Sequence, residues 1–392
     1  MPNFKEQTYK SILNRKKWID NWFWDRYSIN PYSGCSIGCV YCDARSQKYR
    51  NPDAPQLDPA AFEQDIFIKK GAEEILEKKL ASSRSLEKDV VALSGKTDCY
   101  QPAEKVFRNT RKLLQVLQRE SFPVHIVTKS NLVLDDVALL QSIAQETWAA
   151  VSVTITTADA KKSKFLDNKA ANPSKRFKIV ETIKKNFPEI KSGILAIPLV
   201  PGLADDPKDL DSLFAKTKDS GADYILFGGG MTLRDQQALW FLENLKNEFP
   251  ELLPLYEKLY RFRYRPTQYK GQMAPDGKYL LEKHHLLFEI AKKYQLPIRI
   301  PRYIPDDYRN NNYRLAEELF KEAYTRQMLG GDWHGLFWGA HNIQNFNSDI
   351  LTLSEEERST ALNLKEGLLE GINEWVDRNA KGREGDQLWL KF

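Results

Sequence analysis

The chain has 392 residues, of which 42% are hydrophobic, 11% aromatic and 28% charged. This content excludes a disordered protein, because disordered chains bury too little apolar surface to offset the entropy of folding, and the length allows one large core or two domains. The formal net charge of +5 permits a polyanionic partner without requiring one. No signal peptide is recognisable, and the longest nearly apolar run, at 193–204, is too short to span a bilayer. We therefore expect a soluble, cytoplasmic protein with no membrane partner.

Short apolar, β-branched segments alternate with amphipathic helical patterns over the first 250 residues. The segments that predict strands are 27–32, 89–95, 123–130, 149–157, 192–200 and 222–229. The helical patterns lie near 70–82, 103–119, 134–145, 174–187, 207–219 and 233–247. Each predicted strand is almost continuously apolar, as parallel strands covered on both faces are. The pattern predicts an α/β fold of six strand–helix units, either as an open doubly wound sheet or as part of a β/α barrel.

Polar or conformationally special residues recur where the predicted strands end. They are Asn30, Thr97, Thr128, Thr156, Pro201 and Gly228. In β/α barrels the carboxyl ends of all the strands contribute to the active site, whereas a doubly wound sheet needs such residues mainly at one switch point. We therefore predict a partial (β/α)6 barrel.

The pattern changes after about residue 250. The segment 260–279 is rich in loop-forming residues, and helices are predicted near 279–294, 313–328 and 353–378, with a loop or lid at 330–342. We expect three parts: an N-terminal arm over 1–25, the barrel over 26–250, and a mixed C-terminal extension over 251–392. The extension either closes the barrel or forms a small lobe.

The sequence YRFRYR at 260–265 alternates aromatic and basic residues. Arginines that bind phosphates, interleaved with aromatic rings that contact bases, are typical of a nucleic-acid surface. The other interpretation is an edge strand with its aromatic face inward and its charges outward.

Three of the four cysteines, Cys35, Cys39 and Cys42, lie within eight residues. Clustered cysteines in a chain with so few are more often metal ligands than disulfides. A structural zinc ion usually has four ligands, often from two paired knuckles. The sequence has no second CxxC and no HxxxH-type pair, although Cys99 is a candidate distant fourth ligand. Zinc therefore stays an alternative.

A four-iron cluster fits this loop better, because iron–sulfur clusters take thiolate ligands. Three cysteines would hold three irons and leave the fourth open to an exogenous ligand. Gly34 and Gly38 would let the loop wrap the cluster, since glycine tolerates positive φ and leaves its N–H groups free to approach sulfur.

The loop CxxxCxxC, with Tyr41 just before its last cysteine, resembles that of the radical S-adenosylmethionine (SAM) superfamily. The resemblance implies a partial β/α barrel and a [4Fe–4S] cluster whose open iron binds SAM. It also implies that an electron donor such as flavodoxin or ferredoxin drives reductive cleavage of SAM, and that the resulting 5′-deoxyadenosyl radical abstracts hydrogen from a substrate. Over about 26–230 the chain resembles the spore photoproduct lyase branch, chiefly in NPYSGCSIGCVYCDAR (30–45) and SGKTDCYQPAEK (94–105).

The resemblance also suggests residues that contact SAM. The candidates are Tyr41, Thr97, Asp98, Lys129, Ser152 and Arg176. Thr97 and Asp98 would accept hydrogen bonds from the SAM amine, Lys129 would meet its carboxylate as a point charge, and Tyr41 would form a wall for adenine. The structural alternatives are a helix cap for Asp98, a surface loop for Lys129, and ordinary packing for Tyr41.

Arg176 stands out because it lies in the first turn of a predicted helix, where a cation is unfavourable against the helix dipole. A bidentate contact with a carboxylate would explain an arginine there. The alternative is a solvated helix face.

The sequence departs from the lyase branch at one position. Spore photoproduct lyase has a hydrogen-donating cysteine just before the segment that matches Thr97 and Asp98, whereas this chain has Ser94-Gly95-Lys96. Cys99 lies just after the segment, where it either reaches the pocket or is a small buried apolar residue. DNA is the partner that the resemblance suggests. The alternatives are a radical SAM enzyme acting on a peptide or other non-nucleic substrate, and a non-catalytic zinc or iron–sulfur binding protein.

Overall fold

The computed structural model of the chain describes residues 2–49, 60–83, 86–362 and 366–380. It divides into two compact units, Met1–Pro301 and Arg302–Phe392. The sequence pattern led us to expect a boundary near residue 250 instead, and that three-part domain description stays a prediction.

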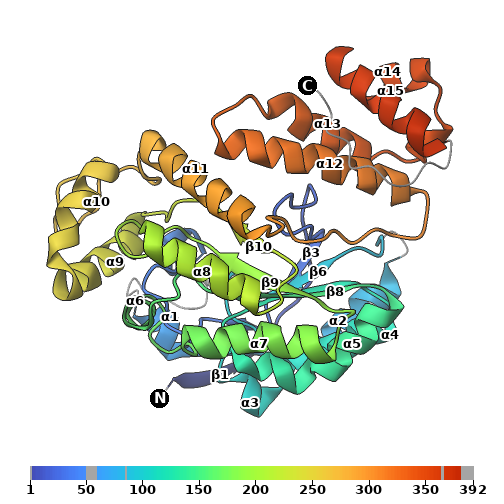
Figure 1. Cartoon of the computed structure of the whole chain (residues 1–392). Coiled ribbons are helices and arrows are strands. Elements are labelled where there is room, and N and C mark those ends of the chain that lie inside the picture. The colour runs from blue at the N-terminus through green and yellow to red at the C-terminus, as the bar shows by residue number, and fades with distance from the viewer. Residues whose placement is uncertain (1, 50–59, 84–85, 363–365, 381–392) are drawn as a thin grey trace. The chain divides into compact units, whose positions relative to one another are not determined.

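A seven-stranded sheet forms the centre of the first unit, in the order β10-β9-β8-β7-β6-β3-β2 (Figure 1). All neighbours in it are parallel except the β2–β3 pair. The strands are β2 (Asn14–Arg15), β3 (Tyr27–Ile29), β6 (Val91–Leu93), β7 (Val124–Thr128), β8 (Ala149–Thr154), β9 (Lys191–Ala196) and β10 (Ile225–Phe227). The six predicted strands thus lie side by side in chain order without a switch point, which confirms the α/β fold with a parallel sheet. Among the described residues β10 and β2 are the two edges of this sheet.

Helices follow the strands and cover the sheet, with α5 and α7 packed against β8 (Figure 1). The longer ones are α2 (Ala72–Ser82), α4 (Asn109–Arg119), α5 (Val137–Glu146), α7 (Pro173–Asn186), α8 (Pro207–Asp219) and α9 (Asp235–Glu248). The sequence determines where several of them begin. Asn172 caps α7 and Asp206 caps α8, each with proline at the first helical position, and such a cap contributes about 1 kcal/mol.

Short helices occupy several of the connections. They are α1 (Ala61–Gln64), α3 (Glu104–Phe107), α6 (Ala160–Leu166) and α10 (Leu253–Leu259). The single helix predicted over 103–119 is wrong, because Arg108 adopts a left-handed conformation with φ 51° and separates α3 from α4.

A second sheet of three strands has the order β1-β5-β4. It consists of β1 (Asn3–Gln7), β4 (Tyr32–Ser33) and β5 (Asp65–Lys69), of which only the region of β4 was predicted. The strand predicted over 27–32 is divided between the two sheets, because Pro31 has no N–H to donate to a ladder. This division places β4 directly before the cysteine loop.

The segment 260–276 is a loop rather than an edge strand, so that interpretation of YRFRYR is wrong. The helix predicted after it is α11 (Gly277–Tyr294). Arg261, Arg263 and Arg265 are exposed.

The second unit consists of helices. They are α12 (Arg309–Met328), α13 (His334–Gln344), α14 (Glu355–Leu362) and α15 (Glu366–Ala380). The loop or lid predicted over 330–342 is wrong, because α13 occupies most of it and packs against α12. In the described part of the chain, no helix is both long enough and apolar enough to cross a membrane.

Candidate metal and cofactor site

The cysteine loop follows β4 and turns twice through left-handed glycines. Gly34 has φ 80° and Gly38 has φ 71°. A Cβ atom on Gly34 would lie 2.4 Å from the Asp65 carbonyl oxygen, so only glycine fits there. Cys35 and Cys39 are each 8% exposed, and neither they nor Cys42 form a disulfide. The loop therefore holds three free, shielded thiols.

These thiols are near enough to influence one another electrostatically. Burial raises the pKa of Cys35 to about 12, with Asp98 and Cys42 as further causes. Burial also raises the pKa of Cys39 well above its ordinary value, although Lys129 opposes it and Cys42 and Cys35 add to it. The thiolate is the form that binds metal, so a bound metal centre must displace these protons.

The donor set suits an iron–sulfur cluster. Three soft sulfur atoms on one loop are the ligand type that such clusters take. The backbone N–H of Asp98 donates to Cys35 Sγ at 3.4 Å, a contact that lowers the pKa of that thiol. Among the described residues, no group of three or more His, Cys, Asp or Glu side chains is arranged to hold a single metal ion.

The loop after β6 fixes the backbone of the cysteine loop. Thr97 Oγ1 donates to the carbonyl oxygen of Gly34 at 2.7 Å, and Gln101 Nε2 donates to the same oxygen at 3.1 Å. Gln101 Oε1 accepts the Ser36 N–H at 2.9 Å. Thr97 thus lies at the cysteine loop, and its hydroxyl contacts the protein backbone. We did not single out Gln101, although it lies in the quoted motif SGKTDCYQPAEK.

Asp98 connects the cysteine loop to the end of β7. Its Oδ1 accepts from Thr128 Oγ1 at 2.7 Å and from the Tyr100 N–H at 2.9 Å, and its Oδ2 accepts from the Lys129 N–H at 2.8 Å. Burial raises the pKa of this carboxyl, and these hydrogen bonds oppose that rise. The Tyr100 contact closes a local turn and is not the helix cap that we considered, because α3 begins at Glu104 after Ala103 and has no side-chain cap. The other two contacts cross to the neighbouring strand.

Tyr41, Lys129 and Arg176 converge on Asp167, a residue that the sequence analysis missed. Tyr41 Oη donates to Asp167 Oδ1 at 2.9 Å, Arg176 Nη1 donates to Asp167 Oδ2 at 2.9 Å, and Lys129 Nζ lies 4.0 Å from Oδ1. The Lys129 ammonium also lies 5.5 Å from the centroid of the Tyr41 ring. We call these four residues the Asp167 cluster.

The charges in the Asp167 cluster stabilise one another. Burial alone would raise the pKa of Asp167, but Lys129 and Arg176 outweigh it, so the pKa lies below its ordinary value. Burial alone would lower the pKa of Lys129, but Cys39, Tyr41 and Asp167 raise it well above its ordinary value. The cluster therefore holds a charged lysine beside the cysteine loop.

Arg176 is fully buried, so the solvated helix face is wrong for it. Besides Asp167, its guanidinium donates to the Thr154 carbonyl oxygen at 2.8 Å and to Ser163 Oγ at 2.7 Å. Arg176 does contact a carboxylate, but it is the carboxylate of Asp167 in the same chain.

A clasp formed by residues 166–169 holds the other side of the cysteine loop. The Val40 N–H donates to the carbonyl oxygen of Leu166 at 3.0 Å, and the Lys169 N–H donates to that of Ile37 at 3.3 Å. Together with the Tyr41–Asp167 hydrogen bond, these contacts tie the loop to the end of α6.

The hydrogen bonds of Ser152 and Cys99 are made with residues outside the Asp167 cluster. Ser152 Oγ is 2.7 Å from His125 Nε2 and 2.7 Å from Tyr224 Oη, inside the sheet. Cys99 is fully buried in the hydrophobic core, and its Sγ donates to the Leu93 carbonyl oxygen at 3.8 Å. Cys99 thus has the environment of a small apolar core residue.

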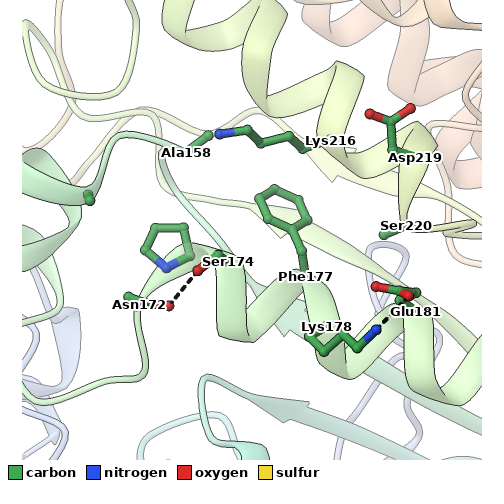
Figure 2. Close-up of a pocket in the computed structure, with 11 residues that line it drawn as sticks. Ala158, Asn172, Ser174, Phe177, Lys178, Glu181, Lys216, Asp219 and Ser220 are labelled. Atoms are coloured by element: carbon green, nitrogen blue, oxygen red, sulfur yellow. Dashed lines mark hydrogen bonds and ion pairs between the residues drawn. The ribbon is translucent and has the colours of Figure 1, made fainter.

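A pocket of about 450 Å³ lies between α7 and α8 (Figure 2). Phe177, Lys178 and Glu181 from α7 and Lys216 and Asp219 from α8 line it. It shares no lining residue with the cysteine loop or the Asp167 cluster, so it is not the site described above.

Residues 29–214 match the family model of the Radical SAM superfamily, so this part of the chain is a radical SAM domain. An uncharacterized protein of Mycobacterium tuberculosis is 28% identical over 262 residues, which cover 67% of this chain and 75% of that protein. An uncharacterized protein of Methanocaldococcus jannaschii is 26% identical over 181 residues, covering 46% of this chain and 62% of that protein.

Among solved structures, spore photoproduct lyase complexed with dinucleoside spore photoproduct has a similar fold. The TM-score is 0.53 at 12% sequence identity, with 74% of this chain and 79% of that chain covered. The resemblance to the radical SAM superfamily is thereby confirmed over residues 29–214, and the likeness to spore photoproduct lyase is a likeness of fold.

Proposed function

We propose that this chain is a radical SAM enzyme in which Cys35, Cys39 and Cys42 hold a [4Fe–4S] cluster that binds SAM. The observation that carries the proposal is the set of three free thiols, two of them buried, on one backbone-fixed loop, within a segment that matches the Radical SAM family model. The cluster and SAM would supply one-electron cleavage of SAM to a 5′-deoxyadenosyl radical, with an electron donor such as flavodoxin or ferredoxin.

The chain's own residues would bind and orient SAM. We assign the Asp98 carboxylate to the SAM amine and the charged Lys129 to the SAM carboxylate, because burial strengthens both contacts. Tyr41 would form a wall for adenine. Arg176 and Asp167 already bind each other, so we assign them to positioning Lys129 and Tyr41. Contacts from Thr97 and Ser152 to SAM stay predictions.

Anaerobic reconstitution tests the proposal directly. Iron and sulfide are counted per chain, and dithionite and SAM are then added while 5′-deoxyadenosine is measured. Because a [4Fe–4S] cluster contains four irons, we expect four irons per chain. We also expect 5′-deoxyadenosine to form only when SAM is added. The Cys39→Ala variant should lose both, whereas Cys99→Ala, which also removes a buried thiol, should keep both. One zinc per chain with no 5′-deoxyadenosine would instead favour a non-catalytic binding protein.

A groove of about 590 Å³ favours a nucleic-acid substrate over a peptide. Lys258, Arg261, Arg263, Arg265 and Lys270 line it, with Glu257 as its one acid. The Arg263 side chain is 88% exposed, and its contact with Glu257 is long, at 3.5 Å. Exposed cations of this density suit phosphates. We therefore propose a lyase-like reaction on DNA. Because no cysteine stands at 94–96, we do not extend the proposal to repair of the spore photoproduct.

A further inference from the structure

A buried arginine, Arg45, lies against the cysteine loop. It ends the short helix η1 (Asp43–Arg45), which follows Cys42 directly. The backbone N–H of Arg45 donates to the Cys42 carbonyl oxygen at 3.2 Å, and its side-chain Nε donates to the Cys39 carbonyl oxygen at 3.1 Å. The side chain has no exposure to solvent. The guanidinium is therefore a buried positive charge in direct contact with the backbone of a proposed cluster ligand.

Aromatic rings flank this guanidinium. Its central carbon, Cζ, lies 4.7 Å from the centroid of the Trp240 ring and 5.6 Å from that of the Phe62 ring. Trp240 belongs to α9 and Phe62 to α1. Rings in these positions keep water from the charge, and a charge in surroundings of low dielectric acts on its neighbours more strongly than a charge in water.

The counter-charge of Arg45 also lies against the loop. Arg45 Nη2 pairs with Glu63 Oε2, and Lys169 Nζ lies 3.0 Å from Glu63 Oε1. A Cβ atom on Gly38 would lie 2.8 Å from Glu63 Oε2, so the carboxylate fills the space that a side chain would take there. The Lys169 side chain is 47% exposed, and water and salt therefore screen its charge. The buried pair thus presents its cation at Cys39 and its anion at Gly38.

Stability alone does not account for this pair, because the cost of desolvating two charges offsets most of their attraction. Its field extends to the cysteines. Burial raises the pKa of Cys42, and the charge of Arg45 is the largest of the causes that oppose this rise. Reduction of an iron–sulfur cluster adds one negative charge, and the charge around a cluster helps to set its reduction potential. A buried cation stabilises the reduced form, and a buried anion destabilises it.

We propose that the Arg45–Glu63 pair sets the reduction potential of the cluster held by the cysteine loop. Arg45 raises the potential and Glu63 lowers it, while the ion pair fixes the distance of each charge from the cluster. The step concerned is the transfer of one electron from a reductant to the oxidised cluster. This assignment rests on the proposed function, because it requires a bound cluster.

A redox titration followed by electron paramagnetic resonance tests the assignment. The reconstituted protein, without SAM, is reduced stepwise with dithionite and redox mediators, and the signal of the reduced cluster gives the midpoint potential. Arg45→Gln should lower the potential and Glu63→Gln should raise it. We expect each to change the ratio of reduced to oxidised cluster about tenfold, which is about 59 mV for a one-electron couple.

Two further variants separate charge from structure. Arg45→Lys keeps the positive charge but loses the planar guanidinium, and its potential should lie near that of wild type. Lys178→Gln removes a lysine from an exposed pair with Glu181 on α7, and it should leave the potential unchanged.

Shifts of the same sign in Arg45→Gln and Glu63→Gln would overturn the proposal, because damage to the loop does not depend on the sign of the lost charge. No shift in either variant, or a potential in Arg45→Lys as low as in Arg45→Gln, would also overturn it. If Arg45→Gln takes up no iron, the rise expected in Glu63→Gln decides. Iron and sulfide are counted in the same preparations. A wild type without a [4Fe–4S] cluster rejects the proposed function and the assignment together, whereas a bound cluster with unchanged potentials rejects the assignment alone.

Discussion

Arg176 Nη1 lies 2.9 Å from Asp167 Oδ2, and neither side chain has any exposure to solvent. Removing one partner of such a pair leaves the other charge buried and unpaired, at a cost of about 3–5 kcal/mol. The pair lies where the cysteine loop, α6 and α7 meet. Its integrity should therefore matter both for folding and for the position of Lys129 and Tyr41.

The first prediction concerns this pair. Asp167→Asn should lower the free energy of unfolding by about 3–5 kcal/mol, measured by urea denaturation. Glu181→Gln, which breaks the exposed pair with Lys178 on α7, is the matched control and should cost at most about 1 kcal/mol. Equal effects of the two variants would show that burial of the Asp167 pair contributes nothing.

The second prediction concerns Gly34. Gly34→Ala forces alanine to adopt φ 80° and places its Cβ against the Asp65 carbonyl oxygen. We expect reconstituted iron to fall sharply, and the protein to lose at least about 1–2 kcal/mol from the left-handed backbone alone. Gly277→Ala, where nothing lies within 4 Å of the added Cβ, should keep its iron. Normal iron content in Gly34→Ala would contradict the role assigned to this turn.

The third prediction concerns Gln101, whose side chain bridges Gly34, Thr97 and Ser36. Gln101→Leu leaves buried groups of the cysteine loop unsatisfied, which costs about 1–3 kcal/mol for each. Iron content after reconstitution should therefore fall relative to wild type. Gln118→Leu, on α4, removes one hydrogen bond to Ser142 and should leave iron content unchanged.

The fourth prediction concerns pH. Burial lowers the pKa of His125 from 6.5 to about 4. Between these values the unfolded chain binds a proton that the folded chain does not, so stability falls as the pH falls through this window. The loss should reach about 3 kcal/mol at 1.36 kcal/mol per pKa unit. His125→Gln should flatten the stability profile between pH 6.5 and 4, and an unchanged profile would place the titration elsewhere.

The fifth prediction concerns the basic groove. Fluorescence anisotropy with labelled duplex DNA should give an affinity that falls linearly on a log–log plot against salt. Arg263→Gln should weaken binding uniformly across sequences and reduce the salt slope by about 1. Lys178→Gln, outside the groove, should leave the slope unchanged. A substrate without phosphates becomes the better proposal if wild type shows no salt-dependent binding.

Local patterns in the sequence predicted much of the fold. Runs of apolar residues predicted the six strands. Polar residues such as Thr97 and Thr128 predicted where the strands end. The cysteine spacing predicted the candidate metal loop. Position in a first helical turn marked Arg176 as unusual, because a cation is disfavoured there.

What stayed hidden depends on contacts between distant parts of the chain. Asp167 follows the short helix α6, in no motif, and its importance appears only when Tyr41 and Arg176 fold onto it. β5 was missed because its pairing partners, β1 and β4, lie far away in the sequence. The helix α13 was taken for a loop because its glycines lower helix propensity, whereas packing against α12 stabilises it.

The clasp at residues 166–169 and the hydrogen bonds from Thr97 and Gln101 hold the cysteine loop from opposite sides by main-chain and side-chain contacts alone. Because the two sets of contacts are separate, a substitution that frees one side of the loop should leave the other side attached.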